Sequence, residues 1–120
     1  MSLVLVVDDS PNLAHAVATL THAIAGCEVI EANDGETALA LVRERQLDLI
    51  VLDYHMPGMS GIDVLRQLRK DGGSDAPPVI MCTADQSVRE EAIRLGAVAV
   101  VPKGEAYDLL LPAIRQYARC

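Results

Sequence analysis

The sequence predicts an α/β fold in which a doubly wound, five-stranded parallel sheet lies between two layers of helices. Five short apolar runs alternate with segments of helical spacing, as in parallel crossover units. Most of these runs are apolar throughout and do not alternate with polar residues, which is typical of strands buried on both faces. Residues that start helices also follow several of the runs. The five runs are Leu3–Val7, Cys27–Ala32, Leu49–Leu52, Val79–Cys82 and Ala97–Val101.

The second run differs from the other four because it contains two acidic residues, Glu28 and Glu31. A strand in the middle of a parallel sheet is covered by helices on both sides and has little room for charged side chains. The polarity of this run therefore predicts a strand at an edge of the sheet.

Helix-start signals stand between the runs. Ser10 precedes Pro11, and proline is well suited to the first position of a helix. Three further pairs have the spacing of a capping box, in which two side chains satisfy free backbone N–H groups at a helix start. These pairs are Asn33 with Glu36, Ser60 with Asp63, and Ser87 with Glu90.

Apolar residues at helical spacing predict the buried faces of the first and third helices. They are Leu13, Val17, Leu20 and Ile24 in the first, and Ile62, Leu65 and Leu68 in the third. Residues 71–78 are rich in glycine and proline and are predicted to form a loop. Pro112 lies inside the last helical segment, where it removes a hydrogen-bond donor. A helix start near Asp108 would accommodate it, whereas a start at Glu105 predicts a kink; we expect the later start.

Composition limits the classes of function. The 120 residues predict one domain, and a formal net charge of −7 disfavours direct binding to nucleic acid or to anionic membranes. Protein partners and cations are favoured. The chain has no Phe or Trp, so its core must be aliphatic and a base-stacking platform is disfavoured. No apolar run is long enough for a signal peptide or a membrane span.

The cysteines bear on the compartment. Cys27, Cys82 and Cys120 are odd in number and have no Cys-x-x-Cys spacing, which predicts neither a disulfide framework nor a zinc knuckle. We therefore expect a reducing, cytoplasmic location. Cys82 is predicted to be a small buried apolar residue. His15 and His22 share a helix face, but no further ligand stands at metal-binding spacing, so both are predicted to be surface residues.

Polar residues with chemical potential follow four of the five runs. Asp8 and Asp9 follow the first run, Asp53 the third, Thr83 the fourth, and Lys103 comes shortly after the fifth. Open parallel sheets place functional groups at the carboxyl ends of their strands. In the strand order 2-1-3-4-5 these four strands are contiguous, and the residues share one rim. Three crowded carboxylates repel one another unless a positive charge compensates, so the pattern predicts a bound cation.

Four motifs resemble the receiver domain of bacterial two-component response regulators. They are Val-Val-Asp-Asp-Ser at 6–10, Asp-Tyr-His-Met-Pro-Gly-Met-Ser-Gly at 53–61, Met-Cys-Thr-Ala at 81–84, and Leu-Gly-Ala-Val-Ala-Val-Val-Pro-Lys at 95–103. Their order and spacing are more specific than any single motif. The resemblance covers residues 1–120 as one receiver domain, and it implies a flavodoxin-like sheet in the order 2-1-3-4-5.

The resemblance implies that Asp53 is a phospho-acceptor, which takes the phosphoryl group from a phosphohistidine of a sensor histidine kinase or phosphotransfer protein. It implies that Thr83 and Lys103 contact phosphoryl oxygens. The domain would be regulatory rather than an enzyme, would assist its own phosphorylation and dephosphorylation, and would change its partner surface on phosphorylation. An output domain, an effector protein or a second copy of the chain are the candidate readers of that change.

The cation implied by the resemblance is Mg²⁺, a small hard ion that prefers oxygen ligands. Asp9 and Asp53 would bind it directly, the backbone carbonyl of His55 would add a ligand, and Asp8 would act directly or through water. The ion would offset the repulsion between the carboxylate and the incoming phosphoryl group.

Alternatives remain at this point. Each residue taken singly has a simpler structural interpretation: Asp9 as a helix cap, Thr83 as a strand terminus and Lys103 as a surface cation. Their joint position at one rim favours the functional interpretation. A flavin-binding electron carrier shares the sheet order, but its first loop must accept a phosphate where this chain has Asp8 and Asp9. An aspartate-nucleophile phosphatase needs a second Asp where this chain has His55. A degenerate receiver, acting as a phosphorylation-independent docking module, is the remaining alternative.

Departures from the receiver pattern concern the output side. Val100 stands where the family commonly has an aromatic residue that reports phosphorylation, so aromatic switching at that position is excluded. Lys103 is followed by Gly104 and preceded by Pro102, and the isomer of the Val101–Pro102 peptide is open. The sequence identifies neither the kinase and its signal nor the output.

Overall fold

The computed structural model describes residues 2–102 and 107–118, and one parallel sheet organises them. The strand order is β2-β1-β3-β4-β5, which confirms the predicted fold class and the edge position of the second strand. The strands are β1 (Leu3–Val7), β2 (Glu28–Ala32), β3 (Leu49–Asp53), β4 (Val79–Cys82) and β5 (Ala99–Val101).

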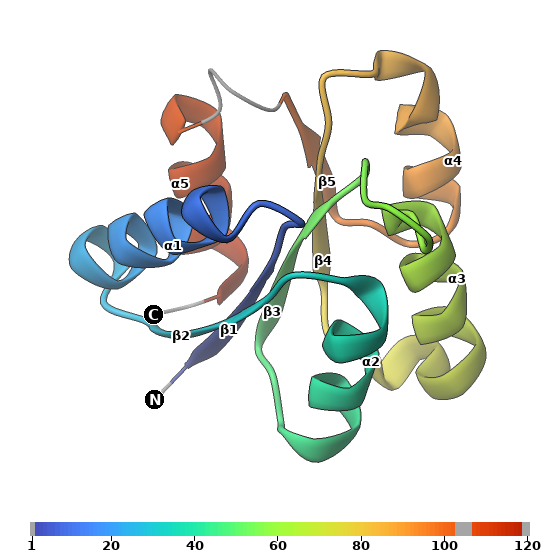
Figure 1. Ribbon diagram of the computed structural model, residues 1–120, viewed down its shortest axis with the longest axis horizontal. Helices are drawn as coiled ribbons and strands as arrows, with labels where there is room; N and C mark the ends of the chain where they lie inside the picture. Colours follow the sequence, from blue (N-terminus) through green and yellow to red (C-terminus); the bar gives the residue numbers. More distant parts are fainter. Residues whose placement is uncertain (1, 103–106, 119–120) are drawn as a thin grey trace.

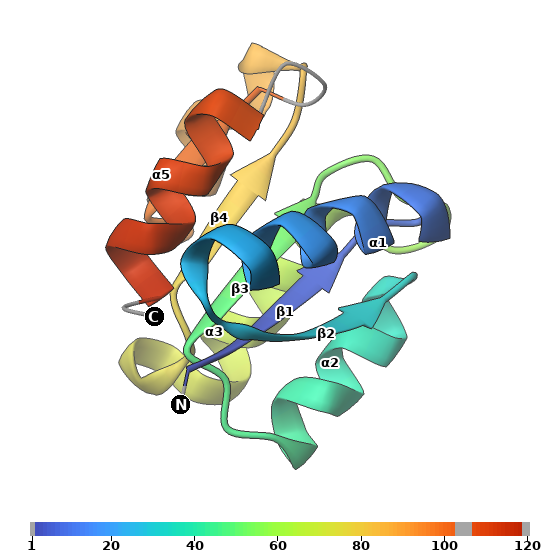
Figure 2. The ribbon, with the colours of Figure 1, turned by 90° about the vertical axis from the view of Figure 1, so that its left-hand side faces the viewer.

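Helices cover both faces of the sheet. Figure 1 shows α1 and α5 on one face and α2, α3 and α4 on the other, and Figure 2 views the sheet from the α1 and α5 side. The helices are α1 (Pro11–Leu20), α2 (Gly35–Glu44), α3 (Gly61–Gly72), α4 (Arg89–Arg94) and α5 (Tyr107–Ala118). Short turns of other helical types are η1 (Thr21–Ala25), η2 (Gly73–Asp75) and η3 (Gln86–Val88). Within residues 2–102 and 107–118, no helix has the length and apolar character that a bilayer span requires.

The core consists of two aliphatic clusters, one on each face of the sheet. Leu5, Leu52 and Leu65 belong to the cluster beneath α2, α3 and α4. Leu49 and Ile114 belong to the cluster beneath α1 and α5. All five of these strand and helix side chains are essentially buried, which agrees with the continuous apolar runs in the sequence.

Two of the three predicted capping boxes are wrong. Ser60 and Asp63 form the predicted box at the start of α3. The start of α2 is instead capped by Asp34, whose side chain accepts the Thr37 N–H at 2.7 Å. The start of α4 at Val88 has no side-chain cap, because the Ser87 hydroxyl donates to Asp85 at 2.6 Å. Several polar residues in these turns compete for each role, and spacing alone does not rank them.

The buried face of α1 also differs from the prediction. Ala14 and Ala18 are buried against the sheet, whereas Leu13 is 42% exposed. Ile24 is 45% exposed because the regular helix ends at Leu20 and η1 changes the direction of the side chains after it. The small alanines allow α1 to pack closely on the strands.

Three further expectations concern chain ends and loops. The predicted loop at 71–78 is shorter than expected, since α3 runs to Gly72 and η2 follows it. In the described part of α5, which begins at Tyr107, Pro112 stands inside the helix; the expected start near Asp108 adjoins residues 103–106, which lie outside the described residues. The Val101–Pro102 peptide is trans.

The cysteine prediction is wrong for Cys27, which is disulfide-bonded. Sequence spacing reveals metal and redox motifs, but it does not reveal a pair that only the fold brings together. The prediction for Cys82 is confirmed, since this residue is buried in the apolar core.

Candidate functional site

The carboxyl ends of β1 and β3 bring three carboxylates together. Val7 pairs with Leu52 in the register of these strands, so Asp8 and Asp53 are the next residues on neighbouring strands. One oxygen from each of Asp8, Asp9 and Asp53 lies within 4.8 Å of the others. Within residues 2–102 and 107–118 this is the only such group of metal-ligating side chains. The predicted acidic cluster is therefore present.

Three hydrogen bonds hold Asp8 in place. Its backbone N–H donates to the Ala32 carbonyl at 3.1 Å, and its Oδ1 accepts the Ser10 N–H at 2.9 Å. The side-chain amide of Asn33 donates to the Asp8 carbonyl at 3.0 Å. Asp8 is buried, whereas Asp9 is exposed.

Asp53 is the last residue of β3 and is only 2% exposed. The Tyr54 N–H donates to the Cys82 carbonyl on the neighbouring strand, and the Gly61 N–H donates to the Tyr54 carbonyl, so the start of α3 folds back against the end of β3. The turn is so tight that a Cβ atom at Gly61 would stand 2.5 Å from the Asp53 carbonyl oxygen. The first residue of α3 thus fixes the backbone of Asp53.

Thr83 follows β4 directly and is fully buried. Its N–H donates to the Val101 carbonyl at 3.0 Å, which ties it to β5. Its Oγ1 accepts the Asp85 N–H at 2.9 Å, so the hydroxyl proton has to point elsewhere. Since Asp53 pairs with Cys82 in the sheet, Thr83 stands one residue beyond Asp53 on the neighbouring strand.

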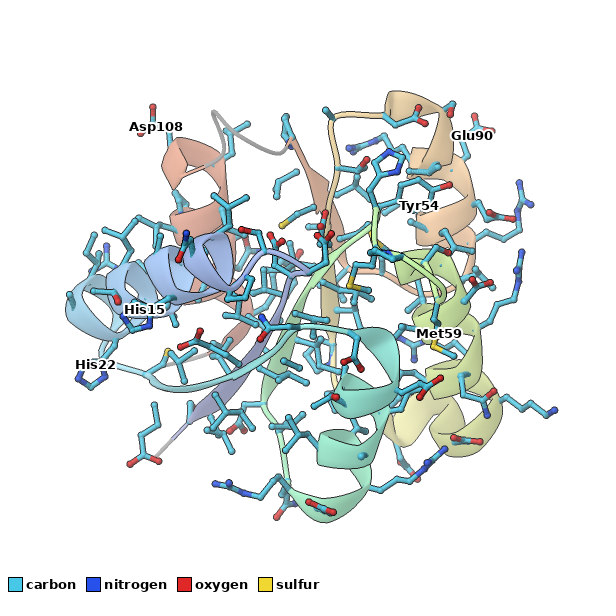
Figure 3. The ribbon with its side chains drawn as sticks, in the orientation of Figure 1. His15, His22, Tyr54, Met59, Glu90 and Asp108 are labelled. Atoms are coloured by element: carbon cyan, nitrogen blue, oxygen red, sulfur yellow. The ribbon has the colours of Figure 1, made fainter. Side chains whose placement is uncertain are left out.

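Asp85 and His55 stand two residues beyond Thr83 and Asp53; Asp85 is half-buried and His55 is exposed. The Ser87 hydroxyl and N–H, which donate to Asp85 Oδ1 at 2.6 and 2.9 Å, hold the pKa of Asp85 below its usual value, and the charge of His55 adds to this lowering. The His55 ring makes an edge contact with the Tyr54 ring, with 4.6 Å between centroids. Figure 3 shows Tyr54 projecting from the end of β3 toward α4.

The donor set fits a small divalent cation. Mg²⁺ binds oxygen at about 2.1 Å, so two of its ligands stand at most about 4.2 Å apart. The carboxylate oxygens of the cluster, within 4.8 Å of one another, need only a small adjustment to reach that spacing. Asp8, Asp9 and Asp53 could hold the ion, and the loop that contains His55 begins at the same rim.

The predicted site residues thus have different outcomes. Asp8, Asp9 and Asp53 are brought together, and Thr83 directly follows β4, the strand beside Asp53. The His55 side chain is exposed and outside the acidic cluster, and the resemblance assigned only its carbonyl to the metal. Lys103 lies outside the described residues. 

Val100 is 7% exposed in the core, and its carbonyl accepts a hydrogen bond from Arg89 Nη1 at 3.1 Å. The start of α4 is thus fixed to β5 at the position where the receiver family commonly has an aromatic residue.

Sequence reasoning missed two residues of the rim. Asn33 was expected to cap a helix but donates to Asp8, and Gly61 was recognised only as part of a motif. The two histidines project outward from the α1 and η1 segment, as predicted (Figure 3). Glu31 does contact His15, with 3.2 Å between Oε2 and Nδ1, although no carboxylate was expected there.

Comparisons with known proteins agree with this geometry. The family model described as response regulator receiver domain matches residues 4–115. The nitrate/nitrite response regulator protein NarP of Escherichia coli is 39% identical over 118 residues, which cover 97% of this chain and 54% of NarP. The chemotaxis protein CheY of Pseudomonas aeruginosa is 35% identical over 97 residues, which cover 81% of this chain and 77% of CheY.

Among solved structures, the response regulator protein TrrA of Thermotoga maritima, in complex with Mg²⁺ and BeF, superposes with a TM-score of 0.86. It is 31% identical, and the match covers 98% of this chain and 99% of TrrA. The chain spans about half the length of the longer regulators that it matches, with 54% of NarP and 52% of the transcriptional regulatory protein KdpE of Mycobacterium tuberculosis.

Proposed function

Because the chain belongs to the response regulator receiver domain family, we propose that it accepts a phosphoryl group on Asp53 from the phosphohistidine of a histidine kinase or phosphotransfer protein. In this proposal the transfer depends on Mg²⁺ and changes the surface that a partner reads. The domain is a regulatory phospho-acceptor that assists its own phosphorylation and dephosphorylation.

One observation carries the proposal. Asp53 is a nearly buried carboxylate at the end of a central strand, with two further carboxylates within 4.8 Å and the hydroxyl-bearing Thr83 on the neighbouring strand. A purely structural role explains one such carboxylate. Three of them at one rim raise the electrostatic energy of the fold unless a cation binds, and they are therefore evidence of function.

The reaction is a transfer between two nucleophiles. A carboxylate oxygen of Asp53 attacks the phosphorus, the new O–P bond forms, and the N–P bond to the donor imidazole breaks with its electron pair left on the nitrogen. The strand and the tight turn at Gly61 hold the carboxylate in place, so that little reorganisation precedes the attack. Phosphoryl transfer needs mainly such positioning together with electrostatic stabilisation.

When bound, Mg²⁺ would supply positive charge that offsets the repulsion between carboxylate and phosphoryl oxygens. Asp8, Asp9 and Asp53 would hold it, with the backbone carbonyl of His55 as a further ligand. The relative TrrA, which was solved with Mg²⁺ and BeF, supports this assignment by similarity.

Thr83 and Lys103 complete the proposal. The Oγ1 of Thr83 already accepts one hydrogen bond from the Asp85 N–H, which leaves its proton available for a phosphoryl oxygen. Lys103 is assigned from the sequence alone, as the cation that would pair with Asp53 and later with the phosphoryl group.

The donor is a protein in this proposal, and the surface beside the rim suits one. Between Pro11 and Ala25 the sequence contains no Asp, Glu, Lys or Arg, and Leu13 is 42% exposed. Such a surface favours contact with another protein over contact with a free anion. A cytoplasmic location belongs to the same proposal; the disulfide at Cys27 is then expected to be reduced in the cell.

The test uses a small phosphodonor with and without Mg²⁺, followed by intact mass measurement. We expect one added phosphoryl group on the wild type with Mg²⁺, almost none without the ion, and none on Asp53→Asn. If Asp53→Asn is modified to the same extent as the wild type, Asp53 is not the acceptor. A wild type that is never modified would favour the phosphorylation-independent docking module.

A further inference from the structure

We propose that Asn33 is a positioning residue for the cation site, and this inference rests on the Mg²⁺ site of the proposed function. Asn33 follows β2 and its side-chain Nδ2 donates to the backbone carbonyl of Asp8 at 3.0 Å. The two residues are 25 positions apart in the sequence, so the bond joins the end of β2 to the end of β1. It is a contact that ties the β2–α2 turn to the acidic rim.

Asp9 is the carboxylate that most needs such support. Asp8 is held through its own Oδ1, and Asp53 belongs to a central strand. Asp9 lies beyond the end of β1 and is exposed, and within residues 2–102 and 107–118 no hydrogen bond holds its carboxylate. Its position therefore depends on the backbone that precedes it.

The peptide between Asp8 and Asp9 supplies that control. The carbonyl that accepts the Asn33 amide belongs to this peptide, so the hydrogen bond fixes the plane from which Asp9 departs. The Asp8 N–H to Ala32 bond secures the preceding peptide in the same way. Together the two bonds hold Asp9 beside Asp8 and Asp53 although the three carboxylates repel one another.

A turn without the Asn33 amide would let Asp9 move toward solvent, because that movement relieves repulsion among the carboxylates. Binding of the cation would then have to restore the position of Asp9 first. Residues that orient metal ligands without touching the metal typically change the affinity by about 10- to 100-fold when they are replaced. Asn33 makes a single, partly buried hydrogen bond to the turn, so we expect the lower end of that range.

The substitution Asn33→Leu tests the inference, since leucine has a similar size and no donor. Asn12→Leu is a matched control: Asn12 is the other asparagine of the chain and is exposed in the first turn of α1. Isothermal titration of the full chain with MgCl₂ alone measures the affinity without any phosphorylation. We expect Asn33→Leu to raise the Mg²⁺ dissociation constant about tenfold, and we expect Asn12→Leu to change it less than about twofold.

Thermal unfolding separates positioning from a general loss of structure. Without Mg²⁺ the two leucine variants should melt near the wild type. At a Mg²⁺ concentration that saturates the wild type, only Asn33→Leu should show a smaller rise in melting temperature than the wild type. If Asn33→Leu does not fold, Asn33→Ala takes its place. If Asn33→Leu binds Mg²⁺ with the dissociation constant of the wild type, the role of Asn33 is overturned and the proposed cation site stands. A wild type that binds no Mg²⁺ overturns the inference together with the proposed cation.

Discussion

Replacement of Gly61 by alanine tests how tightly the turn after Asp53 positions the acceptor. The new Cβ would stand 2.5 Å from the Asp53 carbonyl oxygen and 2.9 Å from the Tyr54 Cα, and both are backbone atoms. Ordinary contact begins at 3.4 Å, so the shortfall at the Asp53 oxygen is about 0.9 Å. Flexible side chains cannot absorb this shortfall, so β3 and the start of α3 must separate.

Two effects follow from that separation. Overpacking of this kind lowers the free energy of unfolding by about 1–3 kcal/mol. A displacement near 1 Å at a reacting group can slow a reaction by about 100-fold, so phosphorylation by a small phosphodonor should slow by one to two orders of magnitude. Urea unfolding measures the first effect and the time course of intact mass the second.

Gly72→Ala is the matched control because it makes the same substitution at the other end of α3. There a Cβ would stand 3.3 Å from the Ala76 Cβ, close to ordinary contact. We expect a wild-type phosphorylation rate in Gly72→Ala. Equal rates in Gly61→Ala and wild type would refute the idea that this turn positions Asp53.

Further predictions concern stability. Hydrogen bonds from Thr37 hold the pKa of Asp34 below its ordinary value, so the stabilisation from Asp34 is complete above that ordinary value and is lost as the pH falls through the lower folded pKa. Urea unfolding of wild type and Asp34→Ala should therefore differ at neutral pH and converge in acid. Ile114→Ala should lower the free energy of unfolding by about 2–5 kcal/mol because its side chain is fully buried. Leu109→Ala on the same helix should change that free energy by less than about 0.5 kcal/mol, since Leu109 is 56% exposed. The buried Thr21 hydroxyl has no hydrogen-bond partner among the residues that the structure describes, so Thr21→Val should raise the free energy of unfolding by up to about 1–3 kcal/mol, and a clear loss would contradict this reasoning.

The fold could be predicted from the sequence because its strands are buried on both faces. Continuous apolar runs such as Leu49–Leu52 carry a strong signal, and the acidic residues of β2 identified the edge. The acidic cluster followed from the same reading, since residues just past neighbouring parallel strands must meet at one rim. These inferences depend only on periodicity and topology.

Local contacts were harder to predict because several residues can fill each role. Asn33 and Asp34 are adjacent and both can cap a helix, and only the three-dimensional path of the turn gives the cap to Asp34 and the Asp8 contact to Asn33. In α1 the larger residue Leu13 was expected inside, yet close packing on the sheet selected Ala14. Such choices depend on distances between elements, which sequence spacing does not contain.

The site of the phosphoryl group is the most direct test of the central claim. Wild-type protein phosphorylated in the presence of Mg²⁺ should be treated with borohydride, which reduces an acyl phosphate, and digested for peptide mass spectrometry. The proposal predicts that the reduced residue is Asp53, at the end of β3, with Asp8 and Asp9 unmodified. Reduction at Asp8 or Asp9, or phosphate recovered on a serine, threonine or histidine instead, would contradict it.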